Sequence, residues 1–445
     1  MIPARLLFCP ARCGALLLGV ALSGCAPSPR PAVAPTEPAP GDAACEIASG
    51  PEVRRESLLV AVTEPVDPAH APIPRNDAER LVFAQLYETL VQVDCGGRVG
   101  PALARSWVAD RAGRRWTFTL REDARFWDGA PVTARDIVAS WASRDTTAVA
   151  SVVAVDERTV NTFLTRPAET VPPLFADPAL AVRKSAPDRG WPIGTGAFWV
   201  GAATASAEAV RAAPLGAGLP VIVFRVVPET DPRDLLDEPV DVLVTNDAAA
   251  LDYAGTREQL VSAALPWERT YVLIAPARIG AGPPALTPAT IAREGLWRAV
   301  RGDARTAAPP YWWEDSRGCP RIDGAGQPPR PAPIRRRVTY ARGDATAQEL
   351  ADRLVALGAV GSGVVAAGLS PRAFSTALQA GGEWAYVVAL PRRVLDPCRM
   401  LRQSLPSTYA ASLVPLVDTR SHAIVRRGVV RLRVGLDGTL RFAPP

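Results

Sequence analysis

The chain has 445 residues, 48% of them hydrophobic and 21% charged, which is the composition of a folded soluble protein. This length is too great for one ordinary core, so we expect two or three lobes. The net charge is only +5 and the basic residues are scattered, which argues against nucleic acid as a partner. Lys184 is the only lysine, and we attribute the excess of arginine to codon bias rather than to anion recognition.

Residues 1–24 are expected to be a signal peptide rather than part of the fold. Arg5 and Arg12 precede an apolar run from Gly14 to Leu22, which is too short for a permanent membrane span. Without these two arginines the net charge falls to +3. Leu22-Ser23-Gly24-Cys25 resembles a bacterial lipobox, which implies cleavage before Cys25 and lipid on its sulfur. The alternative is an ordinary secretory signal with a chance cysteine.

A tether is predicted for residues 25–55. The stretch from Ala26 to about Gly41 is rich in proline and alanine and cannot bury a core. A first strand follows at Ser57 to Thr63. The chain would therefore stand off the membrane surface before its fold begins.

Helix and strand patterns are clearest between residues 83 and 141. Apolar residues at positions 83, 86, 87 and 90 have the spacing of one buried helix face. Arg115 to Arg121 alternates between apolar and polar residues, which predicts a half-buried strand. Asp128-Gly129 predicts a turn. Thr133 and Asp136 form a capping-box pattern that opens a helix burying Ile137, Val138 and Trp141.

The order of six short motifs in this region resembles the signature of the bacterial extracellular solute-binding proteins, family 5, of the dipeptide, oligopeptide and nickel class. These proteins are the capture subunits of ATP-driven (ABC-type) importers. The motifs are Tyr87-Glu88-Thr89-Leu90, Pro101-Ala102-Leu103-Ala104, Ser106-Trp107, Phe118-x-Leu120-Arg121, Phe126-x-Asp128-Gly129 and Pro131-Val132-Thr133-Ala134-x-Asp136.

The fold implied by this resemblance is α/β: a two-lobe periplasmic-binding-protein-like fold of type II, with an extra subdomain in the first lobe. The implied first lobe spans residues 56–267, with residues 75–187 as the extra subdomain. A trimmed second lobe would span residues 268–410, and residues 411–445 would return to the first lobe. Such a protein would lie in the periplasm or on the outer face of a membrane.

Later segments fit this organisation. Strands at Val221 to Val227 and Val240 to Thr245 flank a helical stretch at Asp231 to Leu236, which predicts a parallel sheet. The glycines of Trp191 to Gly196 favour a crossing loop, since glycine allows backbone conformations closed to other residues. The resemblance implies a crossing between lobes at Trp267 to Ala275, a helix at the position of Arg293 to Val300, where the match to the family is poor, and an apolar segment before the last crossing at Leu413 to Asp418. The residues themselves predict a loop at Asp303 to Arg335, strands at Arg337 to Ala341, Val360 to Ala367 and Trp384 to Leu390, helices at Asp344 to Leu357 and after Ser370-Pro371, and hairpins at Val152 to Leu164 and Gly428 to Phe442.

Four cysteines, Cys45, Cys95, Cys319 and Cys398, lie beyond Cys25, and an even number in an exported chain predicts disulfides. Three pairings are possible, and we favour Cys45–Cys95 together with Cys319–Cys398. A structural metal site is the alternative, but the spacings are wide and lack any CxxC pattern.

The ligand site implied by the resemblance lies where strands end and lobes cross. Polar groups after the first strand and after Val240 to Thr245 are candidates, because ligands bind at the carboxyl ends of strands in open α/β sheets. The candidate ligand-binding residues are Thr63, Glu64, Asp67, Thr195, Asn246, Asp247, Trp267, Tyr271 and Arg393.

Arg393 departs from the family pattern. Peptide-binding members place an aspartate, which pairs with the peptide amino group, three residues before the Asp of Asp-Pro; here the Asp-Pro is Asp396-Pro397 and the position holds Arg393. A fixed cation cannot pair with an ammonium group, so we expect an anionic or neutral solute if Arg393 faces the cleft. The alternative is that Arg393 does not align with the family's aspartate position or that it points to solvent.

Enzyme chemistry and cofactors are not expected. His70 and His422 are the only histidines, and no G-x-S-x-G or P-loop motif occurs. With two methionines in the chain, metal capture is not expected either. The expected partners are a small peptide-like, anionic or neutral solute, the permease subunits of an importer, and a membrane held through the lipid; we expect a monomer. The alternative function is a non-transport envelope lipoprotein that kept the fold, lost ligand binding and binds a partner.

Overall fold

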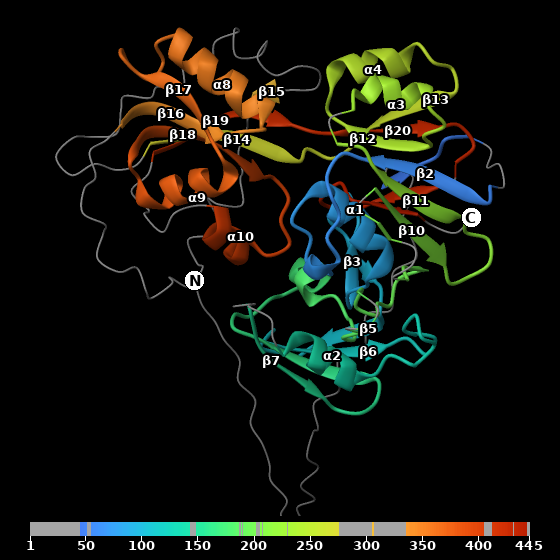
Figure 1. Cartoon of the computed structure of the whole chain (residues 1–445). Helices are drawn as coiled ribbons and strands as arrows, with labels where there is room; N and C mark the ends of the chain where they lie inside the picture. The colour runs from blue at the N-terminus through green and yellow to red at the C-terminus, as the bar shows by residue number, and fades with distance from the viewer. Residues whose placement is uncertain are drawn as a thin grey trace, which may run out of the picture. The chain divides into compact units, whose positions relative to one another are not determined.

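Two β-sheets with helices on both faces carry most of the fold (Figure 1). The computed structural model describes residues 45–50, 55–142, 148–186, 188, 190–201, 205–206, 208–228, 230–275, 305–306, 335–404, 412–429 and 431–442. These residues lie within one compact unit. The predicted signal peptide with Cys25, the proline-rich tether, Cys319, the helix at Arg293 to Val300 and most of the loop at Asp303 to Arg335 lie outside them.

The first sheet has seven strands in the order β13-β20-β12-β2-β11-β10-β9. Its centre, β2 (Ser57–Val62), runs parallel to both β11 (Val221–Val226) and β12 (Val242–Thr245). The predicted parallel strand–helix–strand unit is therefore confirmed, with β2 lying between its two strands. The other members are α3 (Pro232–Asp237), β9 (Phe198–Trp199), β10 (Ala209–Pro214), β13 (Leu260–Ala264) and β20 (His422–Arg426).

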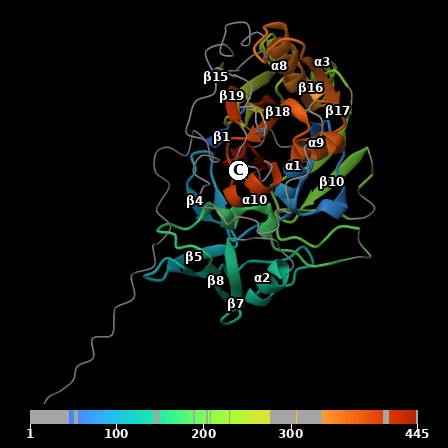
Figure 2. The same ribbon diagram turned by 90° about the vertical axis from the view of Figure 1, so that its left-hand side faces the viewer.

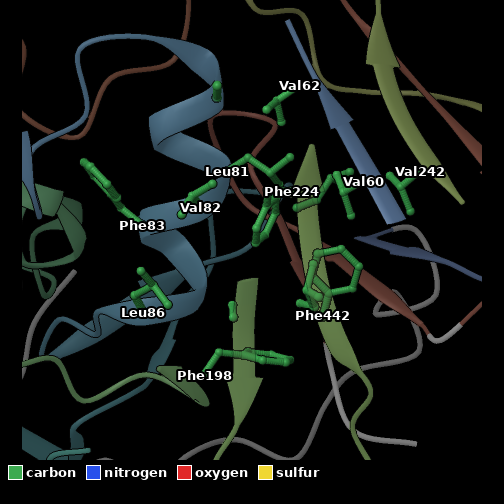
Figure 3. Packing of buried hydrophobic residues seen from close by; sticks show 14 of the residues in the cluster. Val60, Val62, Leu81, Val82, Phe83, Leu86, Phe198, Phe224, Val242 and Phe442 are labelled. Carbon is green, nitrogen blue, oxygen red and sulfur yellow. The ribbon is translucent and has the colours of Figure 1, made fainter. Parts of the chain in front are cut away.

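Alternating side chains send the two faces of this sheet into different cores. Val60 and Val242 pack on the face covered by α1 (Asp77–Leu86), whereas Ala61 and Leu243 pack on the face covered by α3 and α4 (Ala248–Gly255). Figure 3 shows the first core: Val82 and Leu86 of α1 lie among Val60, Phe224 and Phe442. Long apolar runs in these strands follow from burial on both faces.

The second sheet has six strands in the order β15-β19-β14-β18-β16-β17. It has the same design, because Leu273 and Val387 pack with α8 (Ala345–Ala356) while Val272 and Tyr386 pack with α9 (Pro371–Ala380). Its strands are β14 (Arg269–Ala275), β15 (Arg305–Thr306), β16 (Arg335–Ala341), β17 (Val365–Leu369), β18 (Glu383–Pro391) and β19 (Ser412–Thr419), and α10 (Pro397–Ser404) follows β18.

A third, antiparallel sheet has four strands in the order β5-β6-β8-β7, and its first two strands contain part of the motif region. Its helix, α2 (Ala134–Trp141), begins at the predicted capping box of Thr133 and Asp136 and packs against β7 and β8 (Figure 2). The strands are β5 (Ala104–Ala109), β6 (Arg115–Leu120), β7 (Val149–Ala154) and β8 (Thr159–Leu164).

Smaller elements complete the described residues. The hairpin β3 (Val91–Val93) and β4 (Val99–Pro101) lies between α1 and β5 in the chain. The predicted closing hairpin is present as β21 (Leu432–Val434) and β22 (Leu440–Phe442), with β1 (Glu46–Ile47) at its edge. Short 3-10 helices are η2 (Pro68–His70), η3 (Pro173–Ala176) and η4 (Pro178–Leu180). No described helix is long and apolar enough to span a membrane.

Two chain segments pass from the first sheet to the second side by side. β13 leads through residues 265–268 into β14, and β19 leads through residues 420–421 into β20. β13 pairs antiparallel with β20, and β14 pairs antiparallel with β19. Between them, the Leu265 N–H donates to the Ser421 carbonyl over 3.0 Å and the Ser421 hydroxyl donates to Glu268 over 2.8 Å. We call residues 265–268 and 420–421 the crossing pair.

Several element boundaries differ from those predicted. The first helix ends at Leu86, and Tyr87 is an extended cap, so Leu90 is buried but lies outside the helix. α8 ends at Ala356, one residue before the predicted end, and Leu357 is its C-cap and is 38% exposed. The strand predicted at Val360 to Ala367 is β17, which begins at residue 365. Neither β20 nor α10 was predicted.

The glycines of the loop at 191–196 have a different purpose from the one predicted. Neither Gly194 nor Gly196 has a positive φ. A Cβ on Gly194 would lie 2.1 Å from the Leu86 carbonyl oxygen, and one on Gly196 would lie 2.3 Å from that of Gln85. Close approach of this loop to the end of α1, not an unusual backbone conformation, therefore requires glycine.

Gly194→Ala should destabilise the protein. The added methyl group would meet a backbone atom that cannot rotate away, and overpacking of this kind costs about 1–3 kcal/mol. Thermal and urea denaturation would measure the change. Gly216→Ala is the matched control, because a Cβ there meets nothing within 4 Å. Equal stability of the two variants would contradict the close approach.

A buried charge cluster lies beside the crossing pair. Asp418 has no exposed surface, accepts the Thr270 hydroxyl over 2.7 Å and receives the Arg392 guanidinium at 2.9 and 3.0 Å. Arg392 has a side chain only 16% exposed. Loss of one partner would leave a buried charge uncompensated.

Asp418→Ala is accordingly expected to lower the free energy of unfolding by about 3–5 kcal/mol. Glu122→Ala removes an exposed partner of Arg105 and should cost no more than about 1 kcal/mol. Urea denaturation of both variants makes the comparison. If Asp418→Ala costs no more than its control, the loss of Asp418 does not leave Arg392 as an uncompensated buried charge.

Candidate functional site

The predicted acidic residues after β2 are used to cap helices. Glu64 accepts the N–H of Asp77 over 2.9 Å at the start of α1. Asp67 accepts the N–H of Ala69 over 2.9 Å and caps η2. Thr63 is exposed. The rule that polar groups gather at strand ends is followed here, but two of these three side chains have backbone partners.

Of the other predicted residues in and beside the first sheet, Asp247 and Thr195 have backbone partners. Asp247 caps α4 by accepting the N–H of Ala250 over 2.8 Å, while Asn246 beside it is exposed. Thr195 is buried and accepts the N–H of Glu88 over 3.2 Å. Trp267 lies in the crossing pair, where the Arg420 guanidinium stands 4.6 Å from its ring centre.

Tyr271 and its neighbours form a charged cluster at the start of β14. The Tyr271 hydroxyl is 3.1 Å from Asp344, the cap of α8, and burial raises the pKa of Tyr271. Arg269 pairs with Asp77 at 2.6 Å and with Glu268 at 2.9 Å. These ion pairs provide partners for the charged groups at the start of β14.

Arg393 is half-buried and donates to the backbone carbonyl of Cys95. Burial, with Arg392 adding to it, lowers the pKa of its guanidinium. Among the described residues, no carboxylate lies within 4.0 Å of Arg393. Six residues further on, Arg399 pairs with the buried Asp177 at 2.7 Å. Arg393 therefore does not point away to solvent.

A cavity of about 750 Å³ opens beside these contacts. Its walls come from α1, the β3–β4 hairpin, β5 and the β21–β22 hairpin, and Leu395 is its contribution from the segment after β18. None of the nine predicted ligand residues lines it. Its apolar lining includes Phe83, Tyr87, Val99, Trp107, Leu395 and Leu436. This volume is in the range of small-molecule sites, which are mostly apolar with a few polar groups.

Arginine is the prevailing charged residue of the cavity. Five arginines and three acidic residues line it, so its formal charge is +2. Three of the arginines stand near the acids of the lining: Arg98 is 2.8 Å from Asp94, Arg433 is 3.6 Å from Glu46 and Arg80 is 4.0 Å from Asp437. The remaining two are Arg105 and Arg441.

The cavity could not be found from the sequence because its walls come together only in the fold. Residues 80–107 and 433–441 are far apart in the chain. Gln85 of α1 joins them: its amide donates to the Leu440 carbonyl over 2.8 Å and accepts the Phe442 N–H over 3.1 Å. One signal was available, namely the alternation of Leu440, Arg441 and Phe442, which places the arginine opposite two core residues.

Comparisons with known proteins agree with the fold. Residues 98–235 match the family of bacterial extracellular solute-binding proteins, family 5, middle region. The chain is 40% identical over 103 residues to the periplasmic murein peptide-binding protein MppA of Escherichia coli K12, covering 22% of this chain and 18% of that protein. It is 41% identical over 69 residues to the periplasmic oligopeptide-binding protein OppA of the same organism, covering 16% of this chain and 12% of OppA. The matches therefore span less than a fifth of either relative.

Solved structures resemble this chain over most of its length. NikA from Brucella suis, in complex with Fe(III)-EDTA, superposes with a TM-score of 0.64 at 16% identity, covering 87% of this chain and all of NikA. The murein tripeptide-binding protein MppA of Escherichia coli gives 0.62 at 15% identity, covering 87% and 97%. The family resemblance and the two-lobe α/β fold predicted from the sequence are thereby confirmed.

The disulfide beside the cavity is the pairing that we favoured for Cys45. Cys45 and Cys95 are bonded at 2.01 Å across a sequence separation of 50 residues. Cys319 is not among the described residues, so its pairing with Cys398 stays a prediction.

Replacing Cys45 and Cys95 together by alanine should lower the free energy of unfolding by about 4 kcal/mol, since the unfolded chain regains the freedom of a loop of this length. Denaturation of the variant and the wild type without reductant measures the difference. Mass spectrometry under the same conditions controls for reshuffling of the other cysteines. A loss below about 1 kcal/mol would contradict a stabilising bridge.

Proposed function

We propose that this chain, which is related to the bacterial extracellular solute-binding proteins of family 5, captures a small solute and delivers it to the permease of an ABC-type importer. The observation that carries the proposal is the cavity of about 750 Å³, whose walls combine aromatic and aliphatic side chains with eight charged residues. The relatives are named as binding proteins for murein peptide and for oligopeptides, and a small peptide would be a solute that a cavity of this volume can hold.

The crossing pair supplies a means of closure. Among the described residues, the chain connects the two larger sheets at two places only: residues 265–268 connect β13 to β14, and residues 420–421 connect β19 to β20. Short connections of this kind are the usual place for a hinge. A solute would favour the closed arrangement only by binding it more tightly than the open one.

The proposed location is the outer face of a membrane, as a monomer. Lipid on Cys25 would hold the protein there, and the tether of residues 25–55 would let the folded part reach a permease. We propose no enzymatic activity and no cofactor.

One observation favours the alternative of a partner-binding lipoprotein without a ligand. Glu64, Asp67, Asp247 and Arg393 all have hydrogen-bond partners within the protein. A binding cleft whose polar groups are already satisfied has less to offer a solute. The cavity is lined by other residues, so this observation weighs against the predicted cleft rather than against capture.

Native mass spectrometry of the protein purified from its host tests capture. We expect a bound small molecule on the wild type. Ser106→Trp places a large side chain of β5 in the cavity and should lower the fraction of protein that carries the molecule at least about tenfold. The reason is that a steric block should weaken the binding free energy by more than the 1.4 kcal/mol that corresponds to a tenfold change.

Val108→Trp is the matched control, because Val108 lies on the same strand, is 36% exposed and is not part of the cavity lining. It should keep the molecule. A wild-type protein that carries no small molecule, or a ligand that Ser106→Trp leaves in place, would contradict capture in this cavity.

A further inference from the structure

The charges that line the cavity leave one arginine without an acidic partner. Asp94, Glu46 and Asp437 each have an arginine of the lining within 4.0 Å. Arg105 pairs with Glu122, outside the cavity, at 3.3 Å. No carboxylate of the described residues lies within 4.0 Å of the fifth arginine, Arg441.

Strand geometry fixes the position of Arg441. Leu440 and Phe442 are buried in the core with α1, and the residue between them must face the other side of β22. There Arg441 lines the cavity and donates one hydrogen bond, to the Ala84 carbonyl over 2.7 Å. A guanidinium has five N–H donors, so most of them remain for another acceptor.

The surroundings of Arg441 disfavour its charge. Burial lowers the pKa of its guanidinium, and the carboxylates of Glu88 and Asp437 offset this only in part from beyond ion-pair distance. Glu88 is itself held by Arg121 in two hydrogen bonds of 3.1 and 3.0 Å. Since arginine does not lose its proton in proteins, a half-buried guanidinium of this kind is stabilised by an anion from outside.

We propose that the cavity binds an acidic small molecule and that Arg441 receives its carboxylate. This inference rests on the proposed capture function and assigns the class of solute. One guanidinium without an acidic partner matches one carboxylate, which it can hold with two parallel hydrogen bonds. The aromatic and aliphatic walls, among them Phe83, Trp107 and Leu395, suit an apolar body attached to that group.

The same arrangement selects against a free ammonium group. The three acids of the lining already have arginine partners, and the cavity keeps a formal charge of +2. A cation placed there would face net repulsion and gain no free carboxylate. Arg393, whose guanidinium donates to Cys95 at the same disulfide, adds a further positive charge nearby.

The test compares three variants with the wild type by native mass spectrometry after purification from the host. The molecule released from each sample is treated with an esterifying reagent, which adds mass to carboxylic acids, and its phosphorus content is measured to identify a phosphate. We expect an acid without phosphorus. Arg441→Gln should reduce its occupancy at least about tenfold, and Arg441→Lys should reduce it less, since lysine keeps the charge without the planar fork.

Arg433→Gln is the matched control. Arg433 lies on the same hairpin and lines the same cavity, but its side chain is 58% exposed and stands near Glu46. It should keep the bound acid. Circular dichroism of each variant verifies that it is folded.

The outcomes separate this inference from the proposed function. A basic or neutral molecule, a phosphate, or an acid that Arg441→Gln retains would overturn the inference and leave capture standing. A wild-type protein that carries no small molecule would overturn both.

Discussion

The structure depends on two antiparallel chain segments, each of which forms a strand in the first sheet and a strand in the second. β13 and β20 pair in the first sheet, and their continuations β14 and β19 pair in the second. Each sheet buries both of its faces under helices, so neither can slide without exposing a core. Among the described residues, the chain passes between the two sheets only at the crossing pair, so we infer that any motion of one sheet against the other would take place there.

The cluster of Asp418 explains how such a junction stays in register. Thr270 and Asp418 are direct partners across β14 and β19, and both are buried. Arg392, which enters from the end of β18, joins them, so one carboxylate connects three neighbouring strands. A buried ion pair contributes little net stability compared with apolar residues. A shift of β19 against β14 by one residue would, however, move Asp418 to the other face of the sheet and away from Thr270 and Arg392, so the pair selects the observed register. Because this cluster stands next to the crossing pair, we infer that it fixes the register of β14 against β19 where the chain enters the second sheet.

Local signals were sufficient to predict much of the fold. The capping box at Thr133 and the alternation of Arg115 to Arg121 each depend on neighbours within a few residues, and both are found as predicted. The end of α1 was wrong because the apolar spacing continues through Tyr87 and Leu90, which are buried by tertiary contacts in extended structure. β20 was missed because five residues of strand have little pattern of their own.

The candidate site was less predictable, for a related reason. The carboxylates expected at the strand ends stand next to helix starts, where unpaired N–H groups compete for them, and Glu64, Asp67 and Asp247 all accept such bonds. The cavity lies instead where the closing hairpin meets α1, a contact between segments about 350 residues apart that Gln85 secures. Local sequence cannot encode that meeting. The sequence does show a single arginine, Arg441, between two core residues of β22. Its proposed role as the carboxylate-binding residue can be inferred only when the partners of the other charged residues of the cavity are known.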